Sequence, residues 1–290
     1  MKRWIAIIGA LLALTLALHG CSRPTRTDTV VIKGSDTMVN LAQAWAETYT
    51  REHPDANITV TGGGSGTGIA ALVNGDTDIA AASREMKDKE VGQAESKGID
   101  VREFVVARDG VSFIVNPANP VGKLTISQLS DIYTRTITSW KQIGGRDEKI
   151  VVLSRDKSSG THMFVLEQVV REGDSKSTAE FDKSVLMLPS SQVIADEVAG
   201  NEGAIGYVGM GYVDNTRHKA VAVARDAGSP YIEPTPENIM NSTYPIARPL
   251  YLYTAGEPKG TIESFIDFAL SDEGQKIVVQ MDFVPVSSGS

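Results

Sequence analysis

The tripeptide Ser-Gly-Thr occurs twice in this 290-residue chain, each time between an apolar run and an amphipathic stretch. Residues 65–67 follow the apolar run 58–60, and residues 159–161 follow the apolar run 150–153. Each passage predicts a strand, a glycine-containing loop and the start of a helix. Backbone N–H groups and short hydroxyls converge at such a junction, and the helix dipole favours negative charge there. Two such junctions indicate one anion held between two lobes.

A third junction of the same kind lies near the N-terminus. The stretch Gly-Ser-Asp-Thr at residues 34–37 follows the apolar run 30–32. A serine or threonine at any one of these junctions is explained equally well by capping of a helix N-terminus. Three junctions in matching positions favour anion binding over capping alone.

The first residues have the pattern of an export signal. Two basic residues precede a continuous apolar run at 4–18, and Cys21 follows shortly after. The pattern resembles a bacterial lipoprotein signal, which implies cleavage before Cys21 and attachment of lipid to it. We therefore expect a signal peptide at 1–20, a lipid-anchored linker at 21–29, and a domain held outside the cytoplasmic membrane, in the periplasm or at the cell surface. An uncleaved membrane anchor is the alternative, although the run is short for a span.

Composition limits the partners of the mature domain. Cys21 is the sole cysteine, so no disulfide can form within that domain. Removing the two basic residues of the signal leaves 26 basic residues against 36 acidic ones, a net charge of −10. A protein this acidic cannot attract an anion by its overall field, and the balance argues against nucleic acid as a partner. Local dipoles and one or two placed arginines must hold the ligand.

The remaining pattern predicts an α/β fold of two lobes. Strands and helices alternate from residue 30 onward, which favours βαβ units and sheets flanked by helices. Apolar runs at 111–115 and 249–254 are interpreted as strands that cross between the lobes, and a final helix is expected at 262–279. Ligands of open α/β sheets bind at the carboxyl ends of strands, where the three junctions lie. The expected lobes are residues 30–110 with 250–290 for lobe 1 and residues 111–249 for lobe 2.

Several motifs, in order along the chain, resemble a known family. They are residues 34–37, the glycine-rich stretch 61–68, residues 78–84 and residues 155–161, and the ending 271–276 also matches. Together they resemble the PstS-type phosphate-binding lipoproteins, which feed a phosphate ABC transporter. The resemblance covers nearly the whole mature chain. It implies a type II periplasmic-binding-protein fold with a mixed sheet in each lobe, inorganic phosphate as ligand, membrane permease subunits as partners, and a monomer.

The resemblance also implies which residues bind phosphate. Thr37 and Ser65 match first-lobe positions that bind phosphate oxygens in the family. Arg155 matches a second-lobe position, where a guanidinium offers a two-pronged charged donor that lysine cannot provide. The full set of candidate phosphate-binding residues is Ser35, Asp36, Thr37, Ser65, Gly66, Thr67, Ser83, Arg84, Arg155, Ser159, Gly160 and Thr161.

One position departs from the well-studied branch of the family. That branch carries an aspartate, which accepts the proton of phosphate, where this chain has Arg84. Other members resemble this chain in carrying Ser-Arg, so phosphate stays the expected ligand. Asp36 is our candidate for the acceptor, against the alternative that it only caps a helix. Asp156, Glu85 or a backbone carbonyl is the next choice.

Other functions stay open at the level of sequence. One is binding of another tetrahedral oxyanion, such as sulfate, molybdate or tungstate, and another is phosphate sensing or adhesion by a surface lipoprotein. An enzyme is a third alternative, but no catalytic residue, cofactor or metal site is predicted. The chain has no His-Glu-x-x-His motif, and residues 63–67 lack the last glycine of a nucleophile elbow. His162 is expected to be a solvated side chain in the first turn of a helix.

Overall fold

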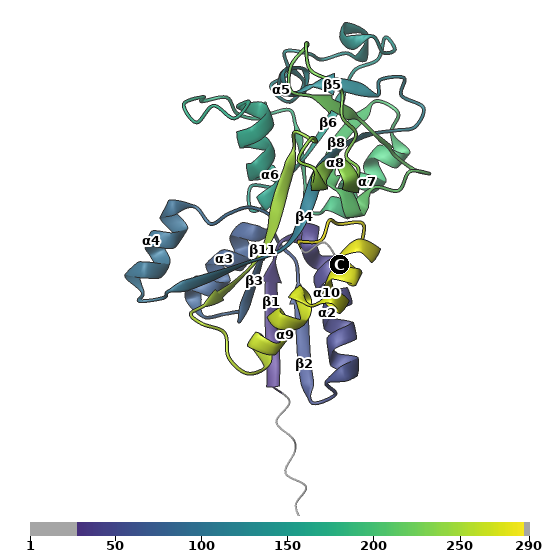
Figure 1. Cartoon of the computed structure of the whole chain (residues 1–290). Helices are drawn as coiled ribbons and strands as arrows, with labels where there is room; N and C mark the ends of the chain where they lie inside the picture. The colour runs from purple at the N-terminus through teal and green to yellow at the C-terminus, as the bar shows by residue number, and fades with distance from the viewer. Residues whose placement is uncertain (1–27, 287–290) are drawn as a thin grey trace, which may run out of the picture.

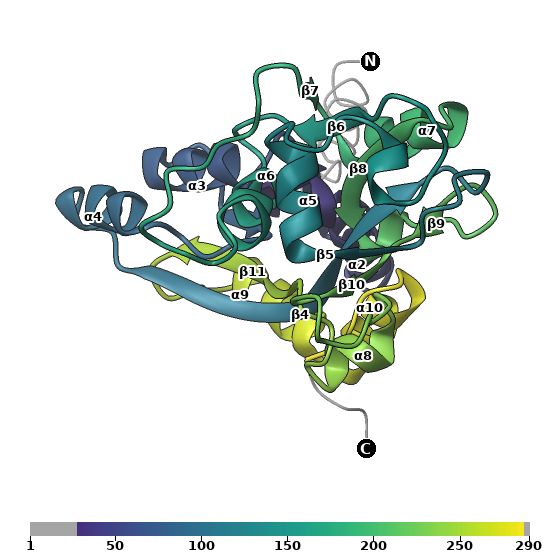
Figure 2. The same cartoon turned by 90° about the horizontal axis from the view of Figure 1, so that it is seen from above.

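The computed structural model describes residues 28–286, which form two lobes joined by two long strands (Figure 1). β4 (Val101–Val115) and β11 (Ala247–Ala255) are antiparallel neighbours that run between the lobes. β4 pairs with β11 as far as Gly110 and with β8 (Ala204–Gly209) from Val111 onward. Seen from above, β4 is one long curved strand that begins beside α4 (Figure 2). The expected signal peptide and Cys21 lie outside the described residues.

The first lobe is a mixed sheet covered by helices, as the predicted fold class requires. β1 lies between β2 and β3 and is parallel to both, whereas β11 is antiparallel to β3. Trp45 donates a hydrogen bond to the carbonyl of Gly274 at 2.8 Å, which ties an early helix to the last one. The elements are β1 (Asp28–Gly34), η1 (Asp36–Met38), α2 (Val39–Glu52), β2 (Ala56–Thr61), α3 (Ser65–Asn74), β3 (Ile79–Ala82), α4 (Asp88–Ser96), α9 (Thr261–Leu270) and α10 (Asp272–Gln280).

The second lobe continues the same sheet and adds a small one. β8 pairs antiparallel with β4 and parallel with β6, and β6 is parallel to the short edge strand β7. β5 and β10 form a separate parallel pair. The elements are β5 (Lys123–Thr125), α5 (Ile126–Tyr133), η2 (Trp140–Ile143), β6 (Val151–Arg155), α6 (Gly160–Val165), the π-helical η3 (Leu166–Val170), β7 (Leu186–Leu188), α7 (Ser191–Gly200), η4 (Met210–Tyr212), β9 (Lys219–Ala220), β10 (Ala222–Ala224) and α8 (Pro236–Met240).

The prediction of a single helix at 262–279 is wrong, because the chain forms two helices there. Ser271 has an extended backbone and caps α10, its hydroxyl accepting a hydrogen bond from the N–H of Gly274 at 3.2 Å. A Cβ on Gly274 would lie 2.1 Å from the carbonyl oxygen of Phe268, so α10 packs directly against the end of α9. Ser-Asp-Glu is a helix-start sequence, and this signal overrides the continuous apolar periodicity.

The strands that position the site all end where the two lobes meet. β1 leads into residues 35–37, β2 into the glycine-rich stretch 62–64, and β3 into residues 83–84. On the other lobe β6 ends at Arg155 and leads into residues 156–159. β1, β2 and β3 are parallel and point their carboxyl ends toward the second lobe, whereas β6 runs in the opposite direction and points its carboxyl end toward the first lobe, so these four loops meet where the lobes join. Among residues 28–286, no helix combines the length and apolar character that a membrane crossing requires.

Candidate functional site at the junction of the lobes

The structure brings most of the predicted phosphate-binding residues together, and their side chains are buried between the lobes. The first lobe supplies loops after β1, β2 and β3, and the second lobe supplies the loop after β6 and the first turn of α6. The buried members of the set are Ser35, Thr37, Ser65, Ser83, Arg155, Ser159, Gly160 and Thr161.

Direct hydrogen bonds join the two lobes at this place. The hydroxyls of Thr37 and Thr161 lie 2.9 Å apart. The N–H of Gly66 donates to the carbonyl of Ser158 at 3.0 Å, and the Ser158 hydroxyl donates to the carbonyl of Gly63 at 3.0 Å. The two Ser-Gly-Thr junctions therefore face one another, as their sequence positions predict.

Glycine is required at two points of this contact. A Cβ on Gly160 would lie 2.3 Å from the Ser65 hydroxyl and 2.7 Å from the Ser83 hydroxyl, which belong to the opposite lobe. Gly64 has a φ of +96°, and a Cβ there would lie 2.6 Å from the carbonyl oxygen of Ser158. Any side chain at either position would hold the lobes apart.

Asp36 lies across the boundary between the lobes. Its Oδ2 atom is 3.1 Å from Nη1 of Arg155 and accepts a hydrogen bond from the N–H of Ser191 at 2.7 Å. Its backbone carbonyl accepts a hydrogen bond from the hydroxyl of Tyr212 at 2.8 Å. Asp36 makes no capping hydrogen bond to its own helix, η1, and instead lies at the N-terminus of α7 in the other lobe.

Arg155 is buried and uses two nitrogens on protein groups. Besides Asp36, Nη1 donates to the Ser191 hydroxyl at 3.0 Å, and Nη2 donates to the carbonyl of Pro189 at 2.9 Å. The Nε atom of Arg155 has no hydrogen-bond partner among the described residues. That nitrogen is the part of the guanidinium that stays available to a ligand.

Three members of the predicted set make side-chain hydrogen bonds inside one lobe. Arg84 forms a two-pronged ion pair with Glu90, at 2.8 and 2.7 Å. Burial raises the pKa of Glu90, but the hydrogen bond and charge of Arg84 outweigh it and hold that pKa below its ordinary value. The Thr67 hydroxyl donates to the carbonyl of Gly63 at 2.8 Å. The Ser159 hydroxyl caps α6 by accepting from the N–H of His162 at 3.3 Å.

Sequence reasoning missed two charged residues that lie beside these loops. Arg248 and Asp109 are opposite each other on the crossing strands and form a fully buried ion pair at 2.8 Å. Arg248 also donates to the Thr161 hydroxyl at 3.0 Å. The available signal was an arginine immediately before the expected crossing strand 249–254 and an aspartate between apolar stretches at 105–107 and 111–115.

The expectation that His162 is solvated is wrong. The side chain is 3% exposed, and Nδ1 lies 3.2 Å from the Ser154 hydroxyl, which contacts the Tyr207 hydroxyl at 2.6 Å. The ring also lies against Phe181, with centroids 4.5 Å apart. Burial lowers the pKa of His162 to about 4, so the ring is neutral at physiological pH. The first turn of α6 is covered because it packs toward the core rather than toward solvent.

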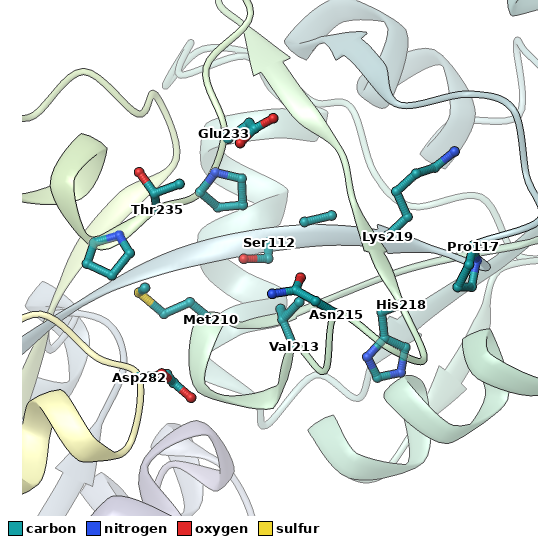
Figure 3. Close-up of a pocket in the computed structure, with 13 residues that line it drawn as sticks. Ser112, Pro117, Met210, Val213, Asn215, His218, Lys219, Glu233, Thr235 and Asp282 are labelled. Atoms are coloured by element: carbon teal, nitrogen blue, oxygen red, sulfur yellow. The ribbon is translucent and has the colours of Figure 1, made fainter.

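Two cavities lie near these residues. One, of about 430 Å³, spans both lobes and is lined by Arg84, Phe164 and Arg248 among others. The other, of about 580 Å³, lies beside β4, and none of the predicted phosphate-binding residues lines it (Figure 3). His218 and Lys219, two of its polar side chains, contact backbone carbonyls of the protein. Among residues 28–286, no three His, Cys, Asp or Glu side chains are grouped so that they could hold a metal ion.

A two-lobed α/β fold, with hydroxyls, helix starts and arginines buried where the lobes meet, defines a solute-binding protein. A family profile described as a PBP superfamily domain matches residues 22–273. The phosphate-binding protein PstS of Staphylococcus epidermidis is 34% identical over 250 residues, covering 84% of this chain and 74% of that protein. The PstS of Pseudomonas aeruginosa is 31% identical over 270 residues, covering 87% and 81%. The chain belongs to the PBP superfamily and, within it, to the PstS family of phosphate-binding proteins.

Solved structures agree with this family. A protein of Clostridium perfringens, described as a phosphate ABC transporter substrate-binding protein and solved with bound phosphate, is 36% identical with a TM-score of 0.80. The match covers 90% of this chain and 100% of that one. An ABC-type phosphate transport receptor of Vibrio cholerae is 31% identical with a TM-score of 0.69, covering 88% and 99%. The fold class predicted from the sequence is therefore confirmed.

Proposed function

We propose that this protein captures inorganic phosphate between its lobes and delivers it to the permease of an ABC transporter. One observation carries the proposal. The buried side-chain polar atoms without a hydrogen-bond partner, among residues 28–286, are Ser35 Oγ, Arg84 Nε and Arg155 Nε. All three belong to residues predicted from the sequence to bind phosphate. Buried polar groups are normally paired, and these hydrogen-bond donors fit an anion whose oxygens accept from them.

The remaining donors of the site support the same ligand. The hydroxyls of Thr37, Ser65 and Thr161 lie on both sides of the lobe boundary. The backbone N–H groups at the start of α6, beginning with Gly160, lack partners within the helix and favour negative charge. Relatives that carry the name phosphate-binding protein, and a related structure that holds phosphate, are consistent with this assignment.

The proposed function has a place in the cell and a mode of action. We place the chain outside the cytoplasmic membrane, anchored by lipid on Cys21 and acting as a monomer that binds phosphate without covalent chemistry. Residues 30–110 with 250–290 and residues 111–249 are the two units that close on the ligand. The change of β4 partners between Gly110 and Val111 supports the first of these boundaries.

Calorimetric titration of the ligand-stripped protein tests the ligand directly. Phosphate and arsenate carry protons near neutral pH and have nearly the same shape, so both should bind, with phosphate the tighter. Sulfate and molybdate should bind far more weakly. Tightest binding of molybdate or sulfate would replace phosphate by another oxyanion, and binding of none of the four would overturn the proposal.

Asp36 is the proposed acceptor of the phosphate proton. Its Oδ2 atom contacts Ser191 and Arg155. Its Oδ1 atom lies beside Gly62, where a Cβ would be 3.5 Å from it. A buried carboxylate oxygen accepts a proton from phosphate and repels fully ionised sulfate, and such mismatches discriminate by a factor on the order of 10⁴–10⁵. Asp36→Asn should bind phosphate but lose much of its preference over sulfate in competition titrations. Unchanged preference would move the acceptor to Asp156, Glu85 or a backbone carbonyl.

A further inference from the structure

Arg248 is placed at the hinge by strand register. It lies on β11 directly opposite Asp109 of β4, and these two strands are the ones that cross between the lobes. Side chains of directly opposed residues on neighbouring strands project from the same face. The pair therefore lies in the connection between the lobes and not at the far end of either lobe.

Asp109 holds the guanidinium in one orientation. Nε and Nη2 of Arg248 both donate to Oδ2 of Asp109, at 3.0 and 2.8 Å. The other carboxylate oxygen accepts from the N–H of Met210 at 3.0 Å, which fixes the carboxylate itself. Both side chains are buried, with 1% and 0% of their surfaces exposed. A buried charge pair with this many hydrogen bonds is rigid, because breaking it leaves an uncompensated charge.

From this anchor Arg248 reaches the ligand loops of both lobes. Nη1 donates to the backbone carbonyl of Ser83 in the first lobe at 2.9 Å. Nη2 donates to the hydroxyl of Thr161 in the second lobe at 3.0 Å. The guanidinium also lies over the ring of Phe164, 5.4 Å from its centroid. One side chain thus connects the hinge with the loops that the sequence assigns to phosphate.

The contact with Thr161 decides which way that hydroxyl can donate. Arginine carries only donors, so the Thr161 oxygen must accept from Arg248. The single proton of Thr161 is then left to point elsewhere, toward Thr37 at 2.9 Å or toward a ligand oxygen. Without the arginine, Thr161 could equally accept from Thr37 and offer its lone pairs to the ligand.

The hydroxyl of Ser65 is set in the same way. It accepts a hydrogen bond from the backbone N–H of Ser83 at 3.0 Å, and the two serine hydroxyls lie 3.3 Å apart. Arg248 donates to the carbonyl of that same Ser83. The hydroxyls of Ser65 and Thr161 therefore each have one occupied lone pair, and each proton can point toward a neighbouring hydroxyl or toward the oxygens of an anion.

We propose that Arg248, held by Asp109, is a positioning residue that fixes the Thr161 hydroxyl as a hydrogen-bond donor to the bound anion. The proposal rests on the proposed function of phosphate capture. Arg248 differs from Arg84 and Arg155 because it donates to a hydroxyl of the predicted phosphate-binding set, whereas the terminal nitrogens of the other two contact Glu90, Asp36, Ser191 and backbone carbonyls. Arg248 acts through Thr161, so its effect on binding depends on the threonine hydroxyl.

A double-mutant cycle between Arg248 and Thr161 tests this, with phosphate binding measured by calorimetry. Arg248→Gln should weaken binding by about 30-fold or more, because a buried donor and its charge are lost. In a Thr161→Val background the same change should cost much less, since the hydroxyl to be oriented is gone. Arg248→Lys keeps the charge but cannot make the fork of contacts, so it should lie between Arg248→Gln and the wild type.

Controls separate positioning from folding. Arg108→Gln changes an exposed neighbour on β4 and should leave phosphate binding unchanged. Circular dichroism verifies that each variant is folded. If Arg248→Gln does not fold, the double-mutant cycle is measured with Arg248→Lys instead. An equal loss in the Thr161→Val and Thr161 backgrounds overturns the inference, because it means that Arg248 acts independently of the Thr161 hydroxyl. Equal phosphate affinity in the wild type and in Arg248→Gln also overturns it. A wild type that binds no oxyanion overturns the proposed function and, with it, this inference.

Discussion

Three arginines at the junction of the lobes are each paired with one carboxylate, so the site presents hydrogen-bond donors with little net positive charge. This agrees with the acidic composition of the chain, which offers no attractive field to an anion. Binding must then come from oriented hydroxyls, backbone N–H groups and the free Nε atoms, whose strength depends on exclusion of water. The pairs are Arg84 with Glu90, Arg155 with Asp36, and Arg248 with Asp109.

His162 should make stability depend on pH in a defined window. Its pKa is about 4 in the folded chain and about 6.5 in an unfolded one. Between these values the unfolded state binds more protons, so stability should fall as pH drops from about 6.5 to about 4 and level off below that. The loss should be at most about 3 kcal/mol.

Denaturant unfolding at pH 7.0, 5.5 and 4.5 checks this for the wild type and for His162→Gln, which keeps a polar contact for Ser154 but does not titrate. The difference in unfolding free energy between the two proteins should shrink as the pH falls. A constant difference across the three pH values contradicts a buried, neutral His162.

At the scale of elements, the sequence predicts what is local and misses what depends on packing. Helix starts and strand ends at the Ser-Gly-Thr junctions follow from short apolar runs and capping residues, and the helices begin within these tripeptides, at Ser65 and at Gly160. The break at Ser271 was hidden because apolar periodicity continues through it. Arg248 was missed because its role arises from register with Asp109, 139 residues away in sequence. Burial of His162 likewise depends on Phe181, which no local pattern places.

The contact between the start of α6 and the first lobe leads to a second prediction. In Gly160→Ala the new methyl group would lie within 2.7 Å of two serine hydroxyls of the opposite lobe, so closure should be strained by about 1–3 kcal/mol and phosphate affinity should fall by the corresponding factor. Gly92→Ala is the matched control, because Gly92 lies within α4 and a Cβ there meets nothing within 4 Å. That variant should bind normally. Normal phosphate affinity in Gly160→Ala would mean that the liganded lobes do not approach as closely as they do here.

For the whole molecule, the proposed function requires a closing step, which would convert separate loops into one site. Two crossing strands connect the lobes (Figure 1). The contacts of Asp36 with the second lobe would break if the lobes separated. Burying the ligand and forming these contacts occur together, so each contact that exists only in the closed state contributes to affinity. Contacts outside the ligand site can therefore change affinity without touching phosphate.

Tyr212 provides a test of this coupling. Its hydroxyl donates to the carbonyl of Asp36 across the boundary, and burial raises the pKa of Tyr212, so the hydroxyl keeps its proton. Tyr212→Phe removes this one hydrogen bond, worth about 0.5–1.5 kcal/mol, so phosphate affinity should fall about 2- to 13-fold. Tyr231→Phe, at an exposed tyrosine of the same lobe, is the control and should bind as the wild type does. Small-angle scattering of the wild type should show a smaller radius of gyration with phosphate than without it. If Tyr212→Phe binds phosphate as tightly as the wild type and becomes compact in the same way, this contact takes no part in closure. If the wild type does not become more compact with phosphate, closure itself is contradicted.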